Sequence, residues 1–129
     1  MANRYGEAAL IAARDSAANE INPIDVWQSA MESLYPTSIA ARRKGSPRSA
    51  FLGLCEEGLV KGIPAGHYKA SKLDKACAVR AAALLTEGSQ TWSIGTLWKA
   101  ATGNSDQPHN SQLDVVMALW KNDLIVRKS

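Results

Sequence analysis

The sequence has few of the residues from which metal centres and disulfide frameworks are built. Its 129 residues include two histidines and two cysteines, and neither His67 nor His109 has a cysteine or carboxylate nearby at metal-ligand spacing. Cys55 and Cys77 fall on apolar faces of expected helices, which favours two buried thiols in a reducing compartment over a disulfide or a redox pair. We therefore expect no metal ion and no cofactor.

Long apolar runs are missing as well. No run approaches the ~20 residues that a membrane-spanning helix needs, and the N-terminus has no charged and then apolar leader. We expect a soluble, cytoplasmic protein that does not associate with a membrane. The length is typical of one domain, so residues 1–129 are expected to form a single helical domain.

Catalytic arrangements are also absent from the sequence. The glycines around residues 62–66 lack the Lys-Ser/Thr pair and the strand-to-helix context of a phosphate-binding loop. Glu56 and Glu57 are adjacent, so on a helix their carboxylates point in different directions. Because no nucleophile, base and orienting residue can be assembled, we expect that the protein is not an enzyme.

The most informative stretch is residues 46–63, which carries signals for the start, the buried face and the end of one helix. Ser46 can cap the helix and Pro47 suits its first turn. Gly58 is placed to end it near Glu57, with Leu59 folding back on the preceding turn as in a Schellman motif. The apolar residues inside this stretch recur at spacings of three and four, which predicts a face directed towards the core.

Similar signals predict further helices along the chain. They are expected over residues 4–18, 22–35, 71–87, 93–102 and 111–122. Residues 37–45 are expected to be a polar, basic connector. Residues 60–69 contain two short extended pieces around a Pro-Ala-Gly turn, so a small β-hairpin and irregular coil are both open.

The second half of the chain resembles the first. The spacing of Leu54, Gly58, Leu59 and Val60 recurs in Leu119, Asp123, Leu124 and Ile125. A tryptophan also recurs in the helix before each of these ends. We therefore predict an all-α fold of two similar three-helix units, at about residues 4–63 and 72–126. Chance similarity between amphipathic helices is the alternative interpretation.

Basic residues are concentrated in the middle of the chain. Residues 42–75 contain eight basic and three acidic residues, whereas the rest of the chain has more acidic than basic residues. Such a segment can attract phosphate backbones, although it can also be no more than a solvated face.

A short helix, a connector and a longer helix followed by a possible hairpin have the layout of a helix-turn-helix or winged-helix module. We therefore hypothesise non-catalytic nucleic-acid binding through a basic surface. The candidate residues are Arg42, Arg43, Lys44, Arg48, Lys61, Lys69, His109, Asn110 and Gln112. The connector is longer than the tight turn of a helix-turn-helix, and Glu56 and Glu57 would repel phosphate if they faced the groove.

The alternative hypothesis is a protein-interaction adaptor or a homodimeric module. Trp92 lies in an expected loop before Ser93, where it could serve as an exposed contact residue. It could equally pack as a hydrophobic staple on the helix that Ser93 caps.

Two stretches resemble an uncharacterised family of small bacterial proteins, a domain of unknown function. They are GSPRSAFLGLCEEGLVKGIP at residues 45–64 and HNSQLDVV at residues 109–116. The resemblance covers most of the chain, from Tyr5 to Ile125. It implies a cytosolic bacterial protein, and it implies no activity, cofactor or catalytic residue.

Overall fold

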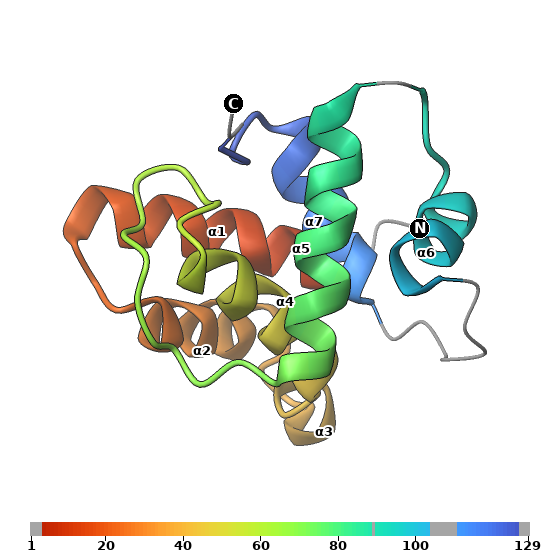
Figure 1. Ribbon diagram of the computed structural model, residues 1–129. Coiled ribbons are helices and arrows are strands. Elements are labelled where there is room, and N and C mark those ends of the chain that lie inside the picture. Colours follow the sequence, from red (N-terminus) through yellow and green to blue (C-terminus); the bar gives the residue numbers. More distant parts are fainter. Residues whose placement is uncertain (1–3, 89, 104–110, 127–129) are drawn as a thin grey trace.

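A computed structural model of the chain describes residues 4–88, 90–103 and 111–126. These residues form helices and no strand, which confirms the all-α prediction. The helices are α1 (Arg4–Asn19), α2 (Pro23–Leu34), α3 (Ile39–Arg42), α4 (Gly45–Glu56), α5 (Lys72–Glu87), α6 (Ile94–Thr102) and α7 (Gln112–Lys121). Figure 1 shows α4 in the middle of the bundle, with α1 and α2 on one side of it and the long α5 on the other.

Several helix boundaries follow directly from side chains at their ends. The side chain of Asn22 accepts a hydrogen bond from the Ile24 N–H (2.8 Å), and Pro23 occupies the first turn of α2 as expected. Ser93 and Thr96 exchange side-chain to backbone hydrogen bonds at the start of α6, which is a complete capping box.

Other expected caps are not formed. Ser46 does not cap α4, because the helix already begins at Gly45 and Lys44 is its N-cap residue. Ser71 and Ser111 are the N-cap residues of α5 and α7, but neither side chain makes the capping hydrogen bond. The Ser71 N–H donates to the Ser49 hydroxyl of α4 (3.0 Å), which joins the start of α5 to α4.

The polar, basic connector between α2 and α4 contains a short helix that the sequence pattern did not predict. This is the one-turn helix α3, whose N-cap residue Ser38 accepts a hydrogen bond from the Ala41 N–H (3.2 Å). The first half of the chain therefore has four helices rather than three.

Helix α4 is enclosed by its neighbours. Eight of its twelve residues are buried, and it packs against α2, α5 and α7. The Phe51 ring of α4 stacks on the Trp27 ring of α2, with ring centroids 5.3 Å apart. At Gly53, an added Cβ would lie only 2.7 Å from the Cβ and Cγ of Lys75 in α5. The close approach of α4 and α5 therefore requires glycine at this position. Cys55 and Cys77 are both buried in this region and form no disulfide, as expected.

Helices α4 and α7 end in the same way. The Leu59 N–H donates to the Leu54 carbonyl (3.0 Å), and the Leu124 N–H donates to the Leu119 carbonyl (2.9 Å), which is the six-residue hydrogen bond of a Schellman motif. The left-handed residue is Gly58 (φ 69°) in one end and Asp123 (φ 59°) in the other. The spacing noted in the sequence therefore corresponds to matching backbone geometry.

The two chain segments that follow these helix ends pair with each other. Val60 and Ile125 form an isolated antiparallel bridge, and both residues are buried. The Lys61 N–H donates to the Leu124 carbonyl (2.9 Å), and the Val126 N–H donates to the Leu59 carbonyl (2.7 Å). The hairpin considered for residues 60–69 is not formed, because Val60 pairs with Ile125 and residues 63–71 are irregular.

The likeness of the two halves has limits. In the proposed repeat, α4 corresponds to α7 and α5 corresponds to α1. The packing of α4 on α5 is matched by the packing of α7 on α1, as this correspondence requires. However, α5 also packs on α7, with no comparable contact from α1 to α4 in the described parts of the chain. The duplication of a whole unit, at about residues 4–63 and 72–126, therefore stays a prediction.

Replacing Gly53 by alanine is expected to lower the free energy of unfolding by roughly 1–3 kcal/mol, because the new methyl group would overlap Lys75. Urea denaturation measures the change. Gly95→Ala in α6 is the matched control, since no atom lies within 4 Å of the added Cβ, and its stability should be unchanged or slightly higher. Equal stability of Gly53→Ala and the unchanged protein would show that α4 and α5 tolerate a wider separation.

Substitutions at the two left-handed positions, Gly58 and Asp123, should have opposite effects on the stability of the protein. Asp123→Gly is expected to stabilise the protein by roughly 0.5–1 kcal/mol, and Gly58→Ala to destabilise it by about 1 kcal/mol, because only glycine adopts a positive φ without strain. Thermal unfolding reports both changes. Asp123→Asn separates the backbone effect from loss of the exposed Lys61–Asp123 ion pair (3.1 Å). A gain of stability with Gly58→Ala would contradict the Schellman assignment.

Candidate functional site

The described residues contain a cleft where α2, α3 and the start of α4 meet. We call it the arginine cleft, and its volume is about 580 Å³. It is lined by Trp27, Gln28, Met31, Glu32, Ile39, Arg42, Arg43, Gly45 and Arg48. Three of the nine residues proposed from the sequence for nucleic-acid binding, all of them arginines, therefore share one concavity.

Contacts from α1 hold α3 beside α2 and α4. The Tyr5 hydroxyl donates to the Ala41 carbonyl of α3 (3.1 Å), and the Lys44 ammonium lies 5.3 Å from the centroid of the Tyr5 ring. The Arg4 guanidinium donates to the Leu34 carbonyl at the end of α2 (2.7 Å). These bonds fix both ends of the connector, so the side chains of α3 are presented on a defined support.

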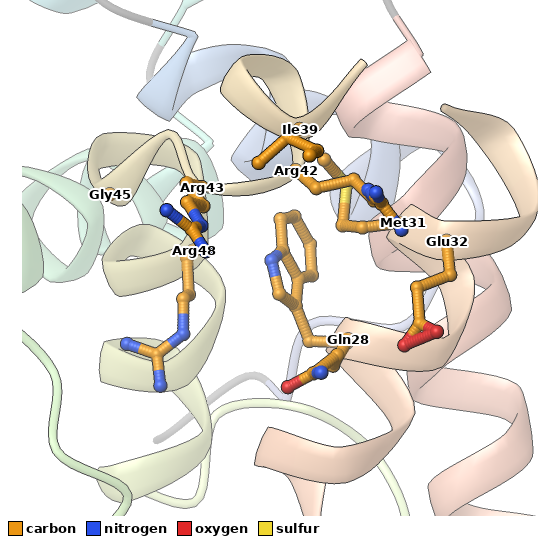
Figure 2. A pocket seen from close by; sticks show the side chains of 9 residues that line it. Gln28, Met31, Glu32, Ile39, Arg42, Arg43, Gly45 and Arg48 are labelled. Atoms are coloured by element: carbon orange, nitrogen blue, oxygen red, sulfur yellow. The ribbon is translucent and has the colours of Figure 1, made fainter. Parts of the chain in front are cut away.

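The arginines of the cleft are not neutralised by the protein. Arg42, Arg43 and Arg48 make no ion pair or side-chain hydrogen bond to any residue in the described ranges. Figure 2 shows Arg43 and Arg48 on one side of the cleft and Met31 and Glu32 on the other. Because a guanidinium group stays charged and presents several N–H donors, the cleft offers an unoccupied set of anion-binding groups.

A buried donor lies in the wall of the same cleft. Trp27 is 1% exposed, and its indole Nε1–H has no hydrogen-bond partner among the described residues. An unpartnered buried donor costs about 1–3 kcal/mol, so native structures seldom keep one without a reason. The packing of Trp27 on Phe51 explains where the ring lies, but it does not satisfy the N–H group.

The residue types that line the cleft suit the binding of an anion. Glu32 is its one carboxylate, so the lining has no carboxylate pair for acid–base work. In the described parts of the chain, no three His, Cys, Asp or Glu side chains lie close enough together to hold a metal ion. Guanidinium groups, an amide and apolar side chains suit an anionic ligand that also carries an apolar part.

Other residues proposed from the sequence lie elsewhere. Lys44 lies over Tyr5, and Lys61 forms an exposed ion pair with Asp123 beside the bridge between the two helix ends. Lys69 is exposed in the irregular connector, at a left-handed backbone position. No contact joins Lys61 or Lys69 to the arginine cleft, and the wing that would have carried them is not formed.

The second expected contact region is not available as proposed. Gln112 is 1% exposed, and its amide donates to the Asp74 carboxylate of α5 (3.0 Å), so it joins two helices instead of facing a ligand. His109 and Asn110 lie outside the described residues.

Helix α4 does not present the exposed face of a groove-reading helix, since burial leaves only its first turn and its last residue accessible. Arg48 is the basic residue on this helix, and it reaches the cleft from the first turn.

Sequence reasoning missed the side of the cleft formed by α2. Gln28 and Glu32 are four residues apart and therefore share a face of α2, which was a recognisable signal. The spacing of Trp27 and Met31 predicts a face of α2 directed towards the core, and both residues are buried, but both also border the cleft.

Comparison with known proteins identifies the family of this chain. The model of a family of unknown function, DUF6979, matches residues 2–126. The chain belongs to this family. No curated protein and no solved structure matches it. DUF6979 membership agrees with the resemblance noted in the sequence and assigns no activity to the cleft.

Two further observations bear on the alternatives considered for this DUF6979 chain. Trp92, proposed as an exposed anchor, is partly buried against the core, and its Nε1 atom is buried. None of the helices in the described residues combines the length and apolar character needed to cross a bilayer.

Glu56 anchors the connector that carries Lys69. Its carboxylate accepts hydrogen bonds from the Tyr68 N–H (2.8 Å) and the Ala70 N–H (3.4 Å), and it pairs with the Lys75 ammonium (3.0 Å). Burial raises the pKa of the Glu56 carboxyl, but these hydrogen bonds and the Lys75 charge outweigh it, so the pKa lies below its usual value. The Glu57 carboxylate also pairs with Lys75, so both glutamates point away from the arginine cleft towards α5.

Glu56→Gln is expected to lower the free energy of unfolding at neutral pH by roughly 1–2 kcal/mol, since it removes a charged acceptor of two backbone N–H groups. Because the folded-state pKa is lowered, this stabilisation is complete above the unfolded pKa of about 4.3 and is lost as the pH falls through the folded value.

Urea midpoints from about pH 7 to about pH 3 should therefore converge for the two proteins in acid. Glu57→Gln is the control and should have the smaller effect, because the Glu57 carboxylate is more exposed than that of Glu56. A constant difference at all pH values would contradict the assigned role of the Glu56 charge.

Proposed function

We propose that this protein is a non-catalytic nucleic-acid-binding protein that holds the phosphate backbone in the arginine cleft. The observation that supports this proposal is a cleft of about 580 Å³ lined by three arginines that form no ion pair or side-chain hydrogen bond with the described residues. Arginine forks match phosphate oxygens in geometry and charge. A cluster left unpaired on the surface is stabilised when an anion replaces the water around it.

The proposed mode of binding differs from groove reading. Residues that read base edges need an exposed helix face, whereas α4 contributes only its first turn and Gln112 is buried. Contacts to phosphate position a nucleic acid without reading its bases. We therefore expect binding that depends little on base sequence and strongly on salt.

Fluorescence anisotropy with a short labelled DNA single strand tests the proposal. If one to three phosphates are neutralised, the affinity should fall by roughly 3- to 20-fold between about 50 mM and 200 mM salt. The combined variant Arg42→Ala, Arg43→Ala and Arg48→Ala should bind at least about 10-fold more weakly at low salt, because it removes the charged lining.

The control variant replaces Arg14, Arg80 and Lys99 by alanine. These residues are exposed and lie outside the cleft. Their replacement removes three positive charges, as many as the cleft variant removes. The control should keep most of the affinity. Equal losses in the two variants would show that only net charge matters, and absence of binding to single-stranded and duplex DNA at low salt would refute the proposal.

A protein-interaction role remains the alternative proposal, and one observation favours it. Ile94 is 38% exposed and borders a mainly apolar groove between α1 and α7, together with Leu10 and Met117. Binding through this groove would depend little on salt, in contrast to binding at the arginine cleft. Ile94→Ser should then weaken self-association in light scattering and leave DNA binding unchanged.

A further inference from the structure

The positions of the arginines that lack an ion pair indicate which class of anion the cleft would bind. Two other basic side chains of the central segment form ion pairs, since Lys61 pairs with Asp123 and Lys75 pairs with two glutamates. The arginines are instead gathered in one concavity and do not form a line along the surface. A strand that crosses a surface needs several separated contacts, whereas a concave cluster focuses its field on one group.

The charges of the cleft match a doubly charged group. Arg42, Arg43 and Arg48 carry three positive charges and Glu32 carries one negative charge. Figure 2 shows Glu32 across the cleft from Arg43 and Arg48, with the Arg42 side chain reaching towards Met31. A phosphodiester inside a strand carries a single negative charge, while a phosphate monoester carries about −1.5 to −2 at neutral pH. A monoester also has three terminal oxygens, so it can accept from more than one guanidinium fork.

The apolar part of the lining suits the organic group to which such a phosphate is attached. Ile39 is 56% exposed at the edge of the cleft, and Met31 and Trp27 form apolar wall. The volume of about 580 Å³ is within the range of small-molecule sites and exceeds what a phosphate group alone fills. The Trp27 Nε1–H is itself buried, so the part of Trp27 that borders the cleft belongs to the apolar wall.

We infer that the arginine cleft binds the phosphate monoester of a nucleotide, whether at the end of a strand or on a free mononucleotide. The inference rests on the proposed function and makes it more specific. The three arginines bind the phosphate, Ile39 contacts the sugar or base, and Glu32 disfavours further negative charge.

The first experiment compares three versions of one single strand of about 12 nucleotides, a length that a small binding domain can cover. One carries a 5′-phosphate, one a 3′-phosphate and one has no terminal phosphate. At least one phosphorylated strand should bind roughly 10-fold or more tightly than the unphosphorylated strand, because the extra charge meets the arginine forks. Equal binding of all three would overturn the inference and leave the proposed function standing, whereas no binding by any strand would refute the proposed function.

Calorimetric titration with thymidine 5′-monophosphate, thymidine and inorganic phosphate identifies the source of the monoester. Thymidine monophosphate should bind, and thymidine should not. If thymidine monophosphate binds while no strand does, the inference holds and the proposed strand-binding function fails. If inorganic phosphate binds as tightly as thymidine monophosphate, the nucleotide part of the inference is overturned.

Two variants test the assigned roles within the cleft. Glu32→Gln should tighten binding of thymidine monophosphate several-fold, because it removes the one negative charge of the lining. Ile39→Ser removes the exposed apolar side chain assigned to the sugar or base, so it should weaken binding several-fold. Circular dichroism establishes that each variant is folded, and an unchanged affinity in folded Glu32→Gln would count against the charge match.

Discussion

The enclosure of α4 by α2, α5 and α7 is the constraint on which the rest of the structure depends. A helix with buried residues along most of its length can reach a ligand only at its ends. Its first turn opens into the arginine cleft, while its last turn holds Glu56 and the Schellman end that leads to the bridge with Ile125. The close contact at Gly53 and the stacking of Phe51 on Trp27 fix the position of α4 between these two ends.

The segments that follow α4 and α7 connect the two halves of the protein through a few backbone hydrogen bonds. One bridge and two flanking hydrogen bonds connect segments that are far apart in the sequence. Because both helices stop in the same geometry, the chain leaves each of them in a corresponding direction, and Val60 and Ile125 meet as equivalent residues. Asp123 stands where the other end has Gly58; aspartate enters the left-handed conformation more readily than most residues other than glycine, because its short polar side chain can form local hydrogen bonds.

The arginine cleft combines features that are costly in isolation. Three like charges line one cleft, and the Trp27 N–H is buried without an acceptor among the described residues. In contrast, Lys75 is neutralised by two carboxylates and Lys61 by one. Ion pairs are therefore formed at Lys61 and Lys75, whereas no ion pair between described residues involves the three arginines of the cleft. This contrast is the physical basis for assigning ligand binding to the cleft rather than to the basic segment as a whole.

The sequence alone determined the features that depend on neighbouring residues. The all-α class, most helix boundaries, the cap at Asn22 and the matching helix ends follow from periodicity and from hydrogen bonds that span a few residues. The cluster of basic residues at positions 42–48 is also a local feature of the chain, so the sequence shows it directly. Only the tertiary structure decided which of these residues meet. It buried Gln112 against Asp74, paired Val60 with Ile125 in place of a hairpin, and brought Arg48 beside α2 and α3. These contacts join residues distant along the chain, so they are set by the packing of helix on helix, which no local pattern encodes.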